Sequence, residues 1–252
     1  MQLSGYPIKF KVNLKSMKTR TLIWAWPTRV FHWMLAIGFA SAYLLGDFDD
    51  YRQFHFAFGA MVGVLALMRI SYGFIGPRYS RFSNFPVGLK NQIAFAKSVF
   101  SKQTDYIGHN PVASLVMLGI MITGVFTAVS GYLLYLNESQ GEMLFAGGYF
   151  VEEAHEIFAN VFLGLVIFHL AGVLVDLFLH GKAGAFYSIF NGFKSVEAKP
   201  GKPNILHQLF GILWICLTVG IFYLAFSLPP LVEKVEGKEG GSKYELHEND
   251  GD

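Results

Sequence analysis

Long apolar segments alternate with short polar connections along this 252-residue sequence. Five segments approach or exceed the roughly 20 residues of helix that a bilayer crossing needs; they cover residues 22–46, 52–75, 110–137, 152–176 and 205–228. Only helices and closed barrels satisfy all their backbone hydrogen bonds inside a bilayer, and these segments have helical length. The pattern predicts an all-α integral membrane protein, with a four-helix transmembrane bundle and a fifth, C-terminal transmembrane helix.

The polar connections divide the chain into expected units. We expect a basic N-terminal segment at residues 1–21, the four-helix domain at 22–195, the fifth helix at 205–228 and an acidic, disordered tail at 229–252. In the long basic connection at 77–109, apolar residues recur at helical spacing among lysines, which predicts an interfacial amphipathic helix. These apolar residues are Leu89, Ile93, Ala96 and Phe100.

The N-terminal region allows alternative interpretations of how the chain is processed. Met17 begins a second plausible start, and Ala40-Ser41-Ala42 resembles the cleavage site of a signal peptide. Polar and bulky residues crowd the place where a signal peptide needs a plain apolar core, which favours a membrane span over a signal peptide. They are Trp24, Trp26, Arg29 and His32.

The charge of the connections alternates along the chain. The N-terminus and residues 77–109 and 177–204 are basic, whereas residues 47–50, 136–153 and the tail are acidic. By the positive-inside rule, the N-terminus is cytoplasmic and the C-terminus is periplasmic, in a multi-pass protein of the bacterial inner membrane. With 53% hydrophobic and only 15% charged residues, the chain is too apolar for an ordinary soluble domain. We expect contact with the lipid bilayer and no nucleic-acid partner.

Two histidines share one face of the fourth span. His155 and His169 are fourteen residues apart, which brings the second to within about 40° of the first and roughly 21 Å further along the axis. Ionisable residues inside a membrane are costly and are usually functional. Either histidine alone could simply bond to a neighbouring helix, but two on one face indicate a shared role at two depths.

The topology pairs these histidines with two others. His32 is in the cytoplasmic half of the first span, at the depth of His169, and His55 begins the second span at the periplasmic side, at the depth of His155. Cofactor sites of helical bundles are built from side chains on facing helices. The expected pairs are therefore His55/His155 at the outer level and His32/His169 at the inner level.

Two imidazoles at each level suit one kind of cofactor. Zinc and copper usually take three or four protein ligands, whereas haem supplies four nitrogens and needs two axial ligands. Cys216 is the only cysteine and no Cys-x-x-Cys-His motif is present, so covalent haem and iron–sulfur clusters are not expected. The sequence predicts two non-covalent b haems, whose iron atoms are bound by His32, His55, His155 and His169.

Several residues near these histidines could complete the cofactor sites. Gly59 and Gly63 would let a flat macrocycle approach the second helix, or they could serve close helix packing. Arg29, Arg52 and Arg69 could meet haem propionates, although arginines at span ends often snorkel to the membrane surface instead.

A quinone site is expected at the cytoplasmic surface. Tyr79, Arg81 and His109 bring polar and aromatic groups close to the inner histidine pair. The alternative is that they bind the headgroups of anionic lipids.

Short motifs in the chain resemble a known family. PTRVFHW (27–33), FHFAFG (54–59), GPRYSRF (76–82), GHNP (108–111) and EEAHEIFAN (152–160) with FH (168–169) resemble the bacterial cytochrome b561 superfamily, and especially the b-type cytochrome subunit of membrane-bound nickel–iron hydrogenases. The resemblance covers about residues 20–195 and implies two b haems and electron exchange between an external partner and the quinone pool. The fifth span and the acidic tail depart from that four-helix core, which leaves the partner open.

With both axial positions filled, the haem iron would favour electron transfer over oxygen chemistry. We expect electron transfer between the membrane quinone and a periplasmic redox protein, which would be a hydrogenase or a c-type cytochrome. One alternative is a stand-alone enzyme such as a superoxide:quinone oxidoreductase. Another is a transporter or membrane anchor without redox cofactors, in which the histidines would be proton or metal relays.

Overall fold

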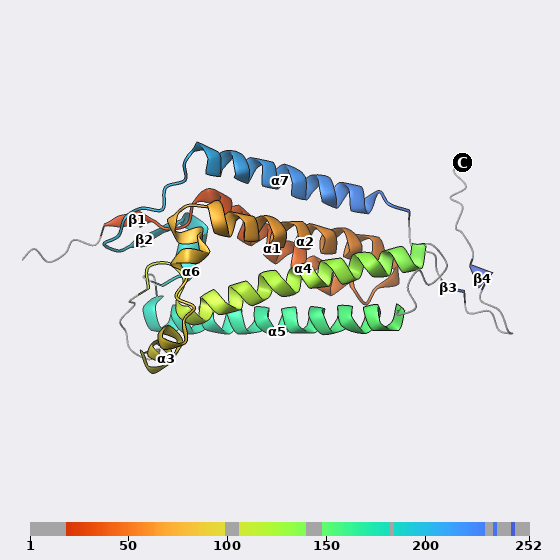
Figure 1. Ribbon diagram of the computed structural model, residues 1–252, viewed down its shortest axis with the longest axis horizontal. Helices are drawn as coiled ribbons and strands as arrows, with labels where there is room; N and C mark the ends of the chain where they lie inside the picture. The colour runs from red at the N-terminus through yellow and green to blue at the C-terminus, as the bar shows by residue number, and fades with distance from the viewer. Residues whose placement is uncertain are drawn as a thin grey trace, which may run out of the picture.

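The computed structural model describes residues 19–98, 106–139, 148–181, 184–229, 234–235 and 243–244. Long helices run side by side and form an elongated bundle (Figure 1). They are α1 (Trp26–Leu45), α2 (Arg52–Ile75), α4 (Pro111–Ser139), α5 (Gly148–His180) and α7 (Ile205–Phe226). The predicted all-α architecture is confirmed, including the additional C-terminal helix.

Four of the long helices in the described part of the chain are apolar and long enough to cross a membrane: α2, α4, α5 and α7. α1 is not among them, because polar Thr28, Arg29 and His32 occupy its first two turns. It nevertheless runs parallel to the others and packs along α2. α1 also begins later than predicted, at Trp26 rather than at residue 22, with Pro27 in the first turn where proline is favoured.

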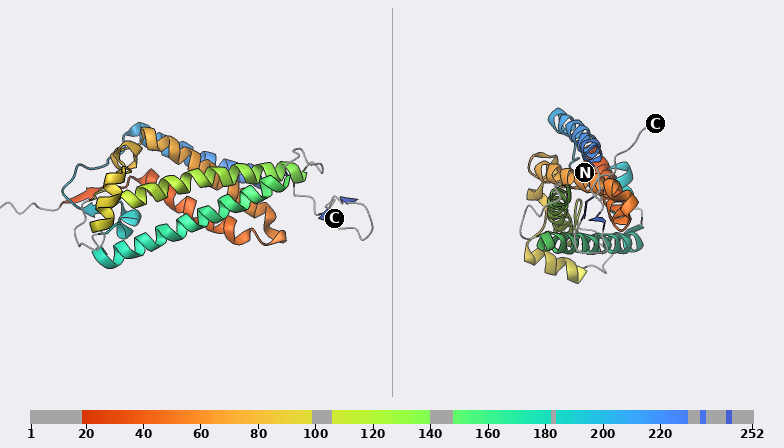
Figure 2. Two further views of the ribbon diagram at one scale, coloured as in Figure 1. Left: turned by 60° about the horizontal axis from the view of Figure 1, so that its bottom comes forward. Right: turned by 90° about the vertical axis from the view of Figure 1, so that its right-hand side faces the viewer.

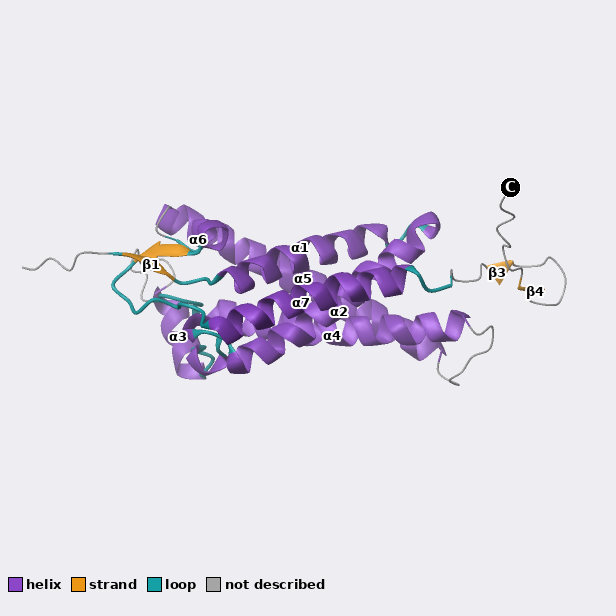
Figure 3. Cartoon of the chain, turned by 90° about the horizontal axis from the view of Figure 1, so that it is seen from above, coloured by secondary structure: helices purple, strands orange, loops and turns teal. Residues whose placement is uncertain are grey.

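One end of the bundle carries short elements that the hydropathy pattern did not predict (Figure 3). Strand β1 (Arg20–Leu22) pairs antiparallel with β2 (Phe193–Ser195), and the short helix α6 (Phe186–Asn191) leads into β2. The amphipathic helix predicted in the basic connection is present as α3 (Leu89–Ser98), with Leu89 and Ile93 exposed; Phe100 lies outside the described residues. We call this the basic end of the bundle, and the opposite end, with residues 46–51, the acidic end.

α2 is the central helix, because it packs against α1, α4 and α7. α5 lies on the opposite side of the bundle from α7 (Figure 2) and packs mainly along α4. Only 6% of the most apolar stretch of α5 is buried, against 44% for α2. The protein itself therefore leaves much of α5 uncovered, although this helix carries two of the four predicted ligands.

α7 is fastened to the bundle at both ends. At the acidic end, Gln53 Nε2 donates to the carbonyl oxygens of Ala225, Phe226 and Leu228, at 2.9–3.2 Å. At the basic end, His207 forms a capping box with Asn204, and its Nε2 bonds the Ile75 carbonyl at 2.8 Å. The added helix is thus an integral part of the fold.

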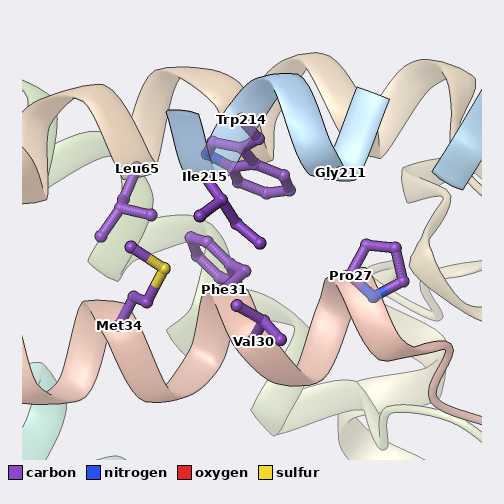
Figure 4. A pocket seen from close by; sticks show the side chains of 8 residues that line it. All are labelled: Pro27, Val30, Phe31, Met34, Leu65, Gly211, Trp214 and Ile215. Atoms are coloured by element: carbon purple, nitrogen blue, oxygen red, sulfur yellow. The ribbon is translucent and has the colours of Figure 1, made fainter. Parts of the chain in front are cut away.

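Apolar side chains fill the space between α7, α1 and α2. Phe31 stacks on Trp214 with ring centroids 5.0 Å apart. A Cβ added to Gly211 would lie 2.9 Å from Pro27, so this glycine permits the close approach of α7 to α1. The remaining cavity in Figure 4 holds about 10 Å³, which is no more than one water. The contact of α7 with α1 and α2 is therefore apolar packing, and its cavity is too small for a cofactor.

The predicted tail is described only in part. Residues Lys234–Val235 (β3) and Lys243–Tyr244 (β4) pair antiparallel. The predicted disorder elsewhere in 229–252, like the basic segment before residue 19, concerns residues outside those described.

Candidate functional site

The structure brings the four histidines together in two couples at opposite ends of the bundle interior. The ring centroids of His55 and His155 are 6.1 Å apart, with an angle of 75° between the ring planes. Those of His32 and His169 are 6.3 Å apart, at 57°. Each couple joins α5 to another helix, which is α2 at the acidic end and α1 at the basic end.

These spacings suit two imidazoles on opposite faces of one metal. An imidazole nitrogen lies about 2 Å from a bound metal, so two rings bound on opposite sides have centroids roughly 6.4 Å apart. In the described part of the chain, no group of three or more His, Cys, Asp or Glu residues could hold a metal ion. Two ligands per level favour haem over zinc.

The backbone fixes the orientation of both histidines at the acidic end. His55 Nδ1 donates to the Ala42 carbonyl at 2.7 Å, and His155 Nδ1 donates to the Thr127 carbonyl at 3.1 Å. Because a carbonyl oxygen only accepts, Nδ1 carries the proton in both rings and Nε2 keeps its lone pair. Ligation through Nε2 with Nδ1–H bonded to a carbonyl is the usual arrangement of metal-binding histidines.

The couple at the basic end is held differently. His32 Nδ1 is buried without a hydrogen-bond partner among the described residues. All four rings are half-buried. The residues present therefore fit a bis-histidine haem at both levels, but only the acidic end supplies backbone partners that fix the ring tautomers.

A stacked aromatic pair separates the two levels. Phe162 lies midway between His155 and His169 on α5 and is 2% exposed. Its ring stacks on Phe39 of α1 with centroids 4.3 Å apart. The pair therefore fills the bundle interior between the two histidine couples.

The two glycines suggested to line the macrocycle have different surroundings. A Cβ on Gly63 would overlap the Ala128 Cβ, so this glycine allows α2 and α4 to pack closely. A Cβ on Gly59 would meet no atom within 4 Å, which leaves space beside α2 one turn from His55. Helix packing therefore accounts for Gly63, whereas Gly59 is compatible with an approaching ligand.

The arginines near the histidines also differ. Arg29 Nη1 donates to the Phe190 carbonyl at 2.6 Å, which ties α1 to α6, and its Nε is buried without a partner among the described residues. Arg52 begins α2 one turn before His55. Arg69 is 1% exposed, so it does not snorkel to the membrane surface.

A cavity of about 240 Å³ opens at the basic end, and two of the three residues predicted for quinone line it. They are Tyr79 and His109, which share it with Arg78, Asn84, Phe85 and Tyr106. Arg81 does not line it, because its Nε donates to the Gly76 carbonyl and caps the end of α2.

The two cavity residues are held in defined positions. The Tyr79 hydroxyl donates to the Lys199 carbonyl at 2.8 Å. The His109 ring lies between Trp24 and Phe85, with centroids at 4.7 and 4.8 Å. Burial, with smaller contributions from Arg69, Lys194 and His169, lowers the pKa of His109 to about 3. His109 is therefore neutral at pH 7 and offers one N–H donor.

The structure also explains motifs that the sequence only singled out. In GHNP, Asn110 Oδ1 accepts from the Ala113 amide at 2.7 Å and caps α4, and Pro111 takes the first helical position. In GPRYSRF, Ser80 bonds Thr28 at 2.8 Å, which joins the end of α2 to the start of α1. These motifs shape the basic end around the cavity.

The comparisons with known proteins agree with this architecture. The family model for prokaryotic cytochrome b561 matches residues 23–192. A probable Ni/Fe-hydrogenase 1 B-type cytochrome subunit from Escherichia coli K12 is 30% identical over 152 residues, covering 50% of this chain and 65% of that protein. A probable Ni/Fe-hydrogenase B-type cytochrome subunit from Rhodobacter capsulatus is 27% identical over 154 residues, covering 49% of this chain and 58% of that protein.

In both cases the chain spans less than two thirds of the length of the curated relative. No solved structure gives a significant match. The family match covers most of the chain, including all four histidines, and it coincides with a multi-pass helical architecture. The chain belongs to the prokaryotic cytochrome b561 family, whose members are b-type cytochromes and carry haem b.

Proposed function

We propose that this chain is a di-haem electron-transfer subunit linking a periplasmic redox protein to the membrane quinone pool. The supporting observation is the presence of two imidazole couples, with centroid spacings of 6.1 and 6.3 Å, at two levels of one bundle. His55 and His155 would hold one b haem, and His32 and His169 the other. Each haem would supply a one-electron carrier whose axial positions are both filled.

Other features of the chain would orient the ligands and separate the two haem sites. Backbone bonds to Nδ1 leave Nε2 of His55 and His155 free, so that Nε2 would bind the iron. The Phe39–Phe162 stack lies between the two levels. Fourteen residues of α5 set a vertical separation of roughly 21 Å between its two ligands. The two levels would thus lie at different depths of the membrane, as electron transfer between its two sides requires.

The charge distribution supports an orientation for this path. Lysines and arginines gather at the basic end, which would be cytoplasmic by the positive-inside rule. The His32/His169 level would then be the inner one, and the His55/His155 level the outer one in the bacterial inner membrane. The N-terminus would be cytoplasmic and the tail after α7 periplasmic.

The cavity lined by Tyr79 and His109 is the proposed quinone site. It lies at the basic end, near the inner level, and has aromatic walls and an N–H donor for a quinone carbonyl. Each quinone reduced to quinol would take two electrons from the inner level and two protons. Arg81 is omitted from the proposed site because it caps α2.

The names of the relatives support a hydrogenase as the partner at the acidic end, and a c-type cytochrome is the alternative. With a hydrogenase, electrons would flow inward to quinone; with a c-type cytochrome acting as acceptor, they would flow outward from quinol. Reduction of the haems by hydrogen, with and without the co-purified partner, distinguishes the two.

Haem content is the first test. Purified protein should contain two b haems per chain, and acid acetone should extract both because no cysteine can bind them covalently. A ratio near one haem per chain would mean that only one histidine couple binds haem. A colourless protein would favour a transporter or membrane anchor. Quinone reduction by superoxide with purified protein alone would favour the stand-alone oxidoreductase.

A further inference from the structure

Arg69 of α2 is a buried cation without an anion. Its side chain is 1% exposed, and its Nη1 has no hydrogen-bond partner among the described residues. Nη2 reaches only the Met117 sulfur, at 3.9 Å, which is a weak acceptor. In the described part of the chain, no carboxylate forms an ion pair with this guanidinium.

The spacing along α2 places Arg69 at the depth of the inner histidine couple. Arg69 follows His55 by fourteen residues on α2, the same spacing that separates His155 from His169 on α5. α2 therefore presents a histidine at the outer level and an arginine at the inner level, within about 40° of one face. The guanidinium carbon lies 5.9 Å from the Phe31 ring of α1 and 5.6 Å from the Phe82 ring.

These neighbours put the charge inside the bundle, between α1, α2 and α4. Arg69 and His169 are both near enough to His109 to influence its protonation, which locates all three in one neighbourhood. A buried charge is retained only when it is paired and hydrogen-bonded, because desolvation of an unpaired guanidinium is costly. The site therefore needs an anion that the described residues do not provide.

We propose that Arg69 is the counter-ion of a haem propionate carboxylate at the His32/His169 level. This inference rests on the proposed bis-histidine haem at that level. A guanidinium binds a carboxylate through two parallel hydrogen bonds, and Nη1 is free for such a pair. The headgroup of a membrane lipid offers similar chemistry, but it belongs to the membrane surface, whereas this guanidinium is enclosed by three helices.

The proposed pair gives Arg69 an effect on the inner haem alone. A fixed positive charge near the iron favours the reduced state, which carries one positive charge fewer. At the outer level, the corresponding position on this face of α2 is occupied by His55. Arg69 would therefore raise the reduction potential of the inner haem relative to the outer one and favour electron flow toward the basic end.

Redox titration of the full-length protein in detergent tests this assignment. The first variant, Arg69→Met, removes the charge and keeps an unbranched side chain. The second, Arg69→Lys, keeps the charge but cannot form the two parallel hydrogen bonds of a guanidinium. Arg20→Met is the matched control, because Arg20 is exposed on β1 and lies over the Phe193 ring. A His155→Leu background, expected to lack the outer haem, identifies which haem responds.

Arg69→Met should lower the midpoint potential of the inner haem or release that haem, while the outer haem keeps its potential. Arg69→Lys should lower the inner potential by less, and Arg20→Met should change neither. Equal midpoint potentials in all four proteins, with two haems in each, would overturn the assignment and leave the di-haem proposal intact. Loss of bound phospholipid from Arg69→Met without a change in potential would assign the site to a lipid instead.

If Arg69→Met does not fold, the midpoint potentials of Arg69→Lys test the proposed ion pair. A lowered inner potential in that variant supports the pair, and an unchanged one rejects it. Failure of the underlying di-haem proposal would show separately, as a wild-type protein with fewer than two haems.

Discussion

The histidine couples at the two ends of the bundle have nearly the same spacing but different surroundings. At the acidic end, backbone carbonyls of Ala42 and Thr127 accept from Nδ1 of His55 and His155. At the basic end, His32 Nδ1 has no partner among the described residues, and a buried arginine lies nearby without an anion. Backbone hydrogen bonds fix the ring orientation at the acidic end. At the basic end, buried polar atoms of His32 and Arg69 have no hydrogen-bond partner among the described residues.

This difference separates two ways of tuning a bound haem. Hydrogen bonds to the axial ligands raise their basicity and fix their orientation, and they act at the acidic end. Fixed charges act through space, and they are found at the basic end, where Arg69 and Lys194 lie near His109, as His169 of the inner couple does. We expect the two haems to respond to different substitutions, and the predictions below run from the largest expected effect to the smallest.

Removal of an axial ligand should have the largest effect. His155→Leu should remove the outer haem and keep the inner one, and His169→Leu should do the reverse, because a leucine cannot bind iron. Haem content per chain should fall from two to one in each. The double variant His55→Leu/His155→Leu should lose no more haem than either single variant, because both residues serve one iron.

The same series tests the assignment of levels. His55→Leu and His169→Leu combined should leave no haem, because they empty different sites. If the combined variant retained one haem, these two residues would share a site and the pairing seen in the structure would not describe the ligands.

Quinone chemistry should depend on the basic end only. His109→Leu removes the N–H donor from the cavity, and we expect quinone reduction to fall by up to about 10-fold, which corresponds to the loss of one hydrogen bond. Arg81→Gln should have a much smaller effect, because Arg81 bonds the Gly76 carbonyl and does not line the cavity. The measurement is quinone reductase activity with haem content as control. Equal losses in both variants would favour a lipid-binding role for this surface.

The sequence was sufficient to predict the helices and to propose the ligand pairs, because both depend on periodicity. Apolar length predicted the five long helices. The fourteen-residue spacing on α5 and the topology together predicted the couples His55/His155 and His32/His169, whose ring centroids lie 6.1 and 6.3 Å apart in the structure. Arg81 shows the limit: its proximity in sequence to Tyr79 suggested a shared site, but its side chain turns back to cap α2.

The hydropathy pattern could not predict contacts between segments that are distant in the sequence. The pairing of β1 with β2 joins residues about 170 positions apart, and three-residue strands carry almost no periodic signal. The bond from His155 to the Thr127 carbonyl depends on the rotation of α4 relative to α5. Burial of Arg69 likewise depends on how α1 and α4 cover α2, so the sequence allowed both a snorkelling and a buried position.

A smaller effect is expected from the second partner of His155 at the acidic end. The Ser130 hydroxyl lies 3.1 Å from His155 Nδ1 and donates to the Phe126 carbonyl, so its oxygen can accept from the ring. Ser130→Ala should speed loss of the outer haem, by less than the roughly 10-fold typical of such partners, because Thr127 still accepts. Ser71→Ala is the control, since Ser71 makes the same type of bond within α2. Identical rates of haem transfer in both variants would remove Ser130 from the site.

The smallest effect concerns the attachment of α7, which also differs between the ends. At the acidic end a single side chain, Gln53, donates to the carbonyl oxygens of Ala225, Phe226 and Leu228, at and just beyond the C-terminus of α7. Gln53→Ala should lower the free energy of unfolding by about 1 kcal/mol, the usual net value of such a bond.

Gln53→Glu should destabilise more than Gln53→Ala, because it places a carboxylate against carbonyl oxygens and against the negative end of the helix dipole. Thermal unfolding in detergent, followed by haem absorbance and by helical signal, measures both. Neither variant should alter the inner haem, which lies at the opposite end of the bundle. If Gln53→Glu were as stable as the wild type, the donor role of Gln53 would be wrong. The His207 bond at the basic end and the apolar contacts of α7 would then hold this helix in place.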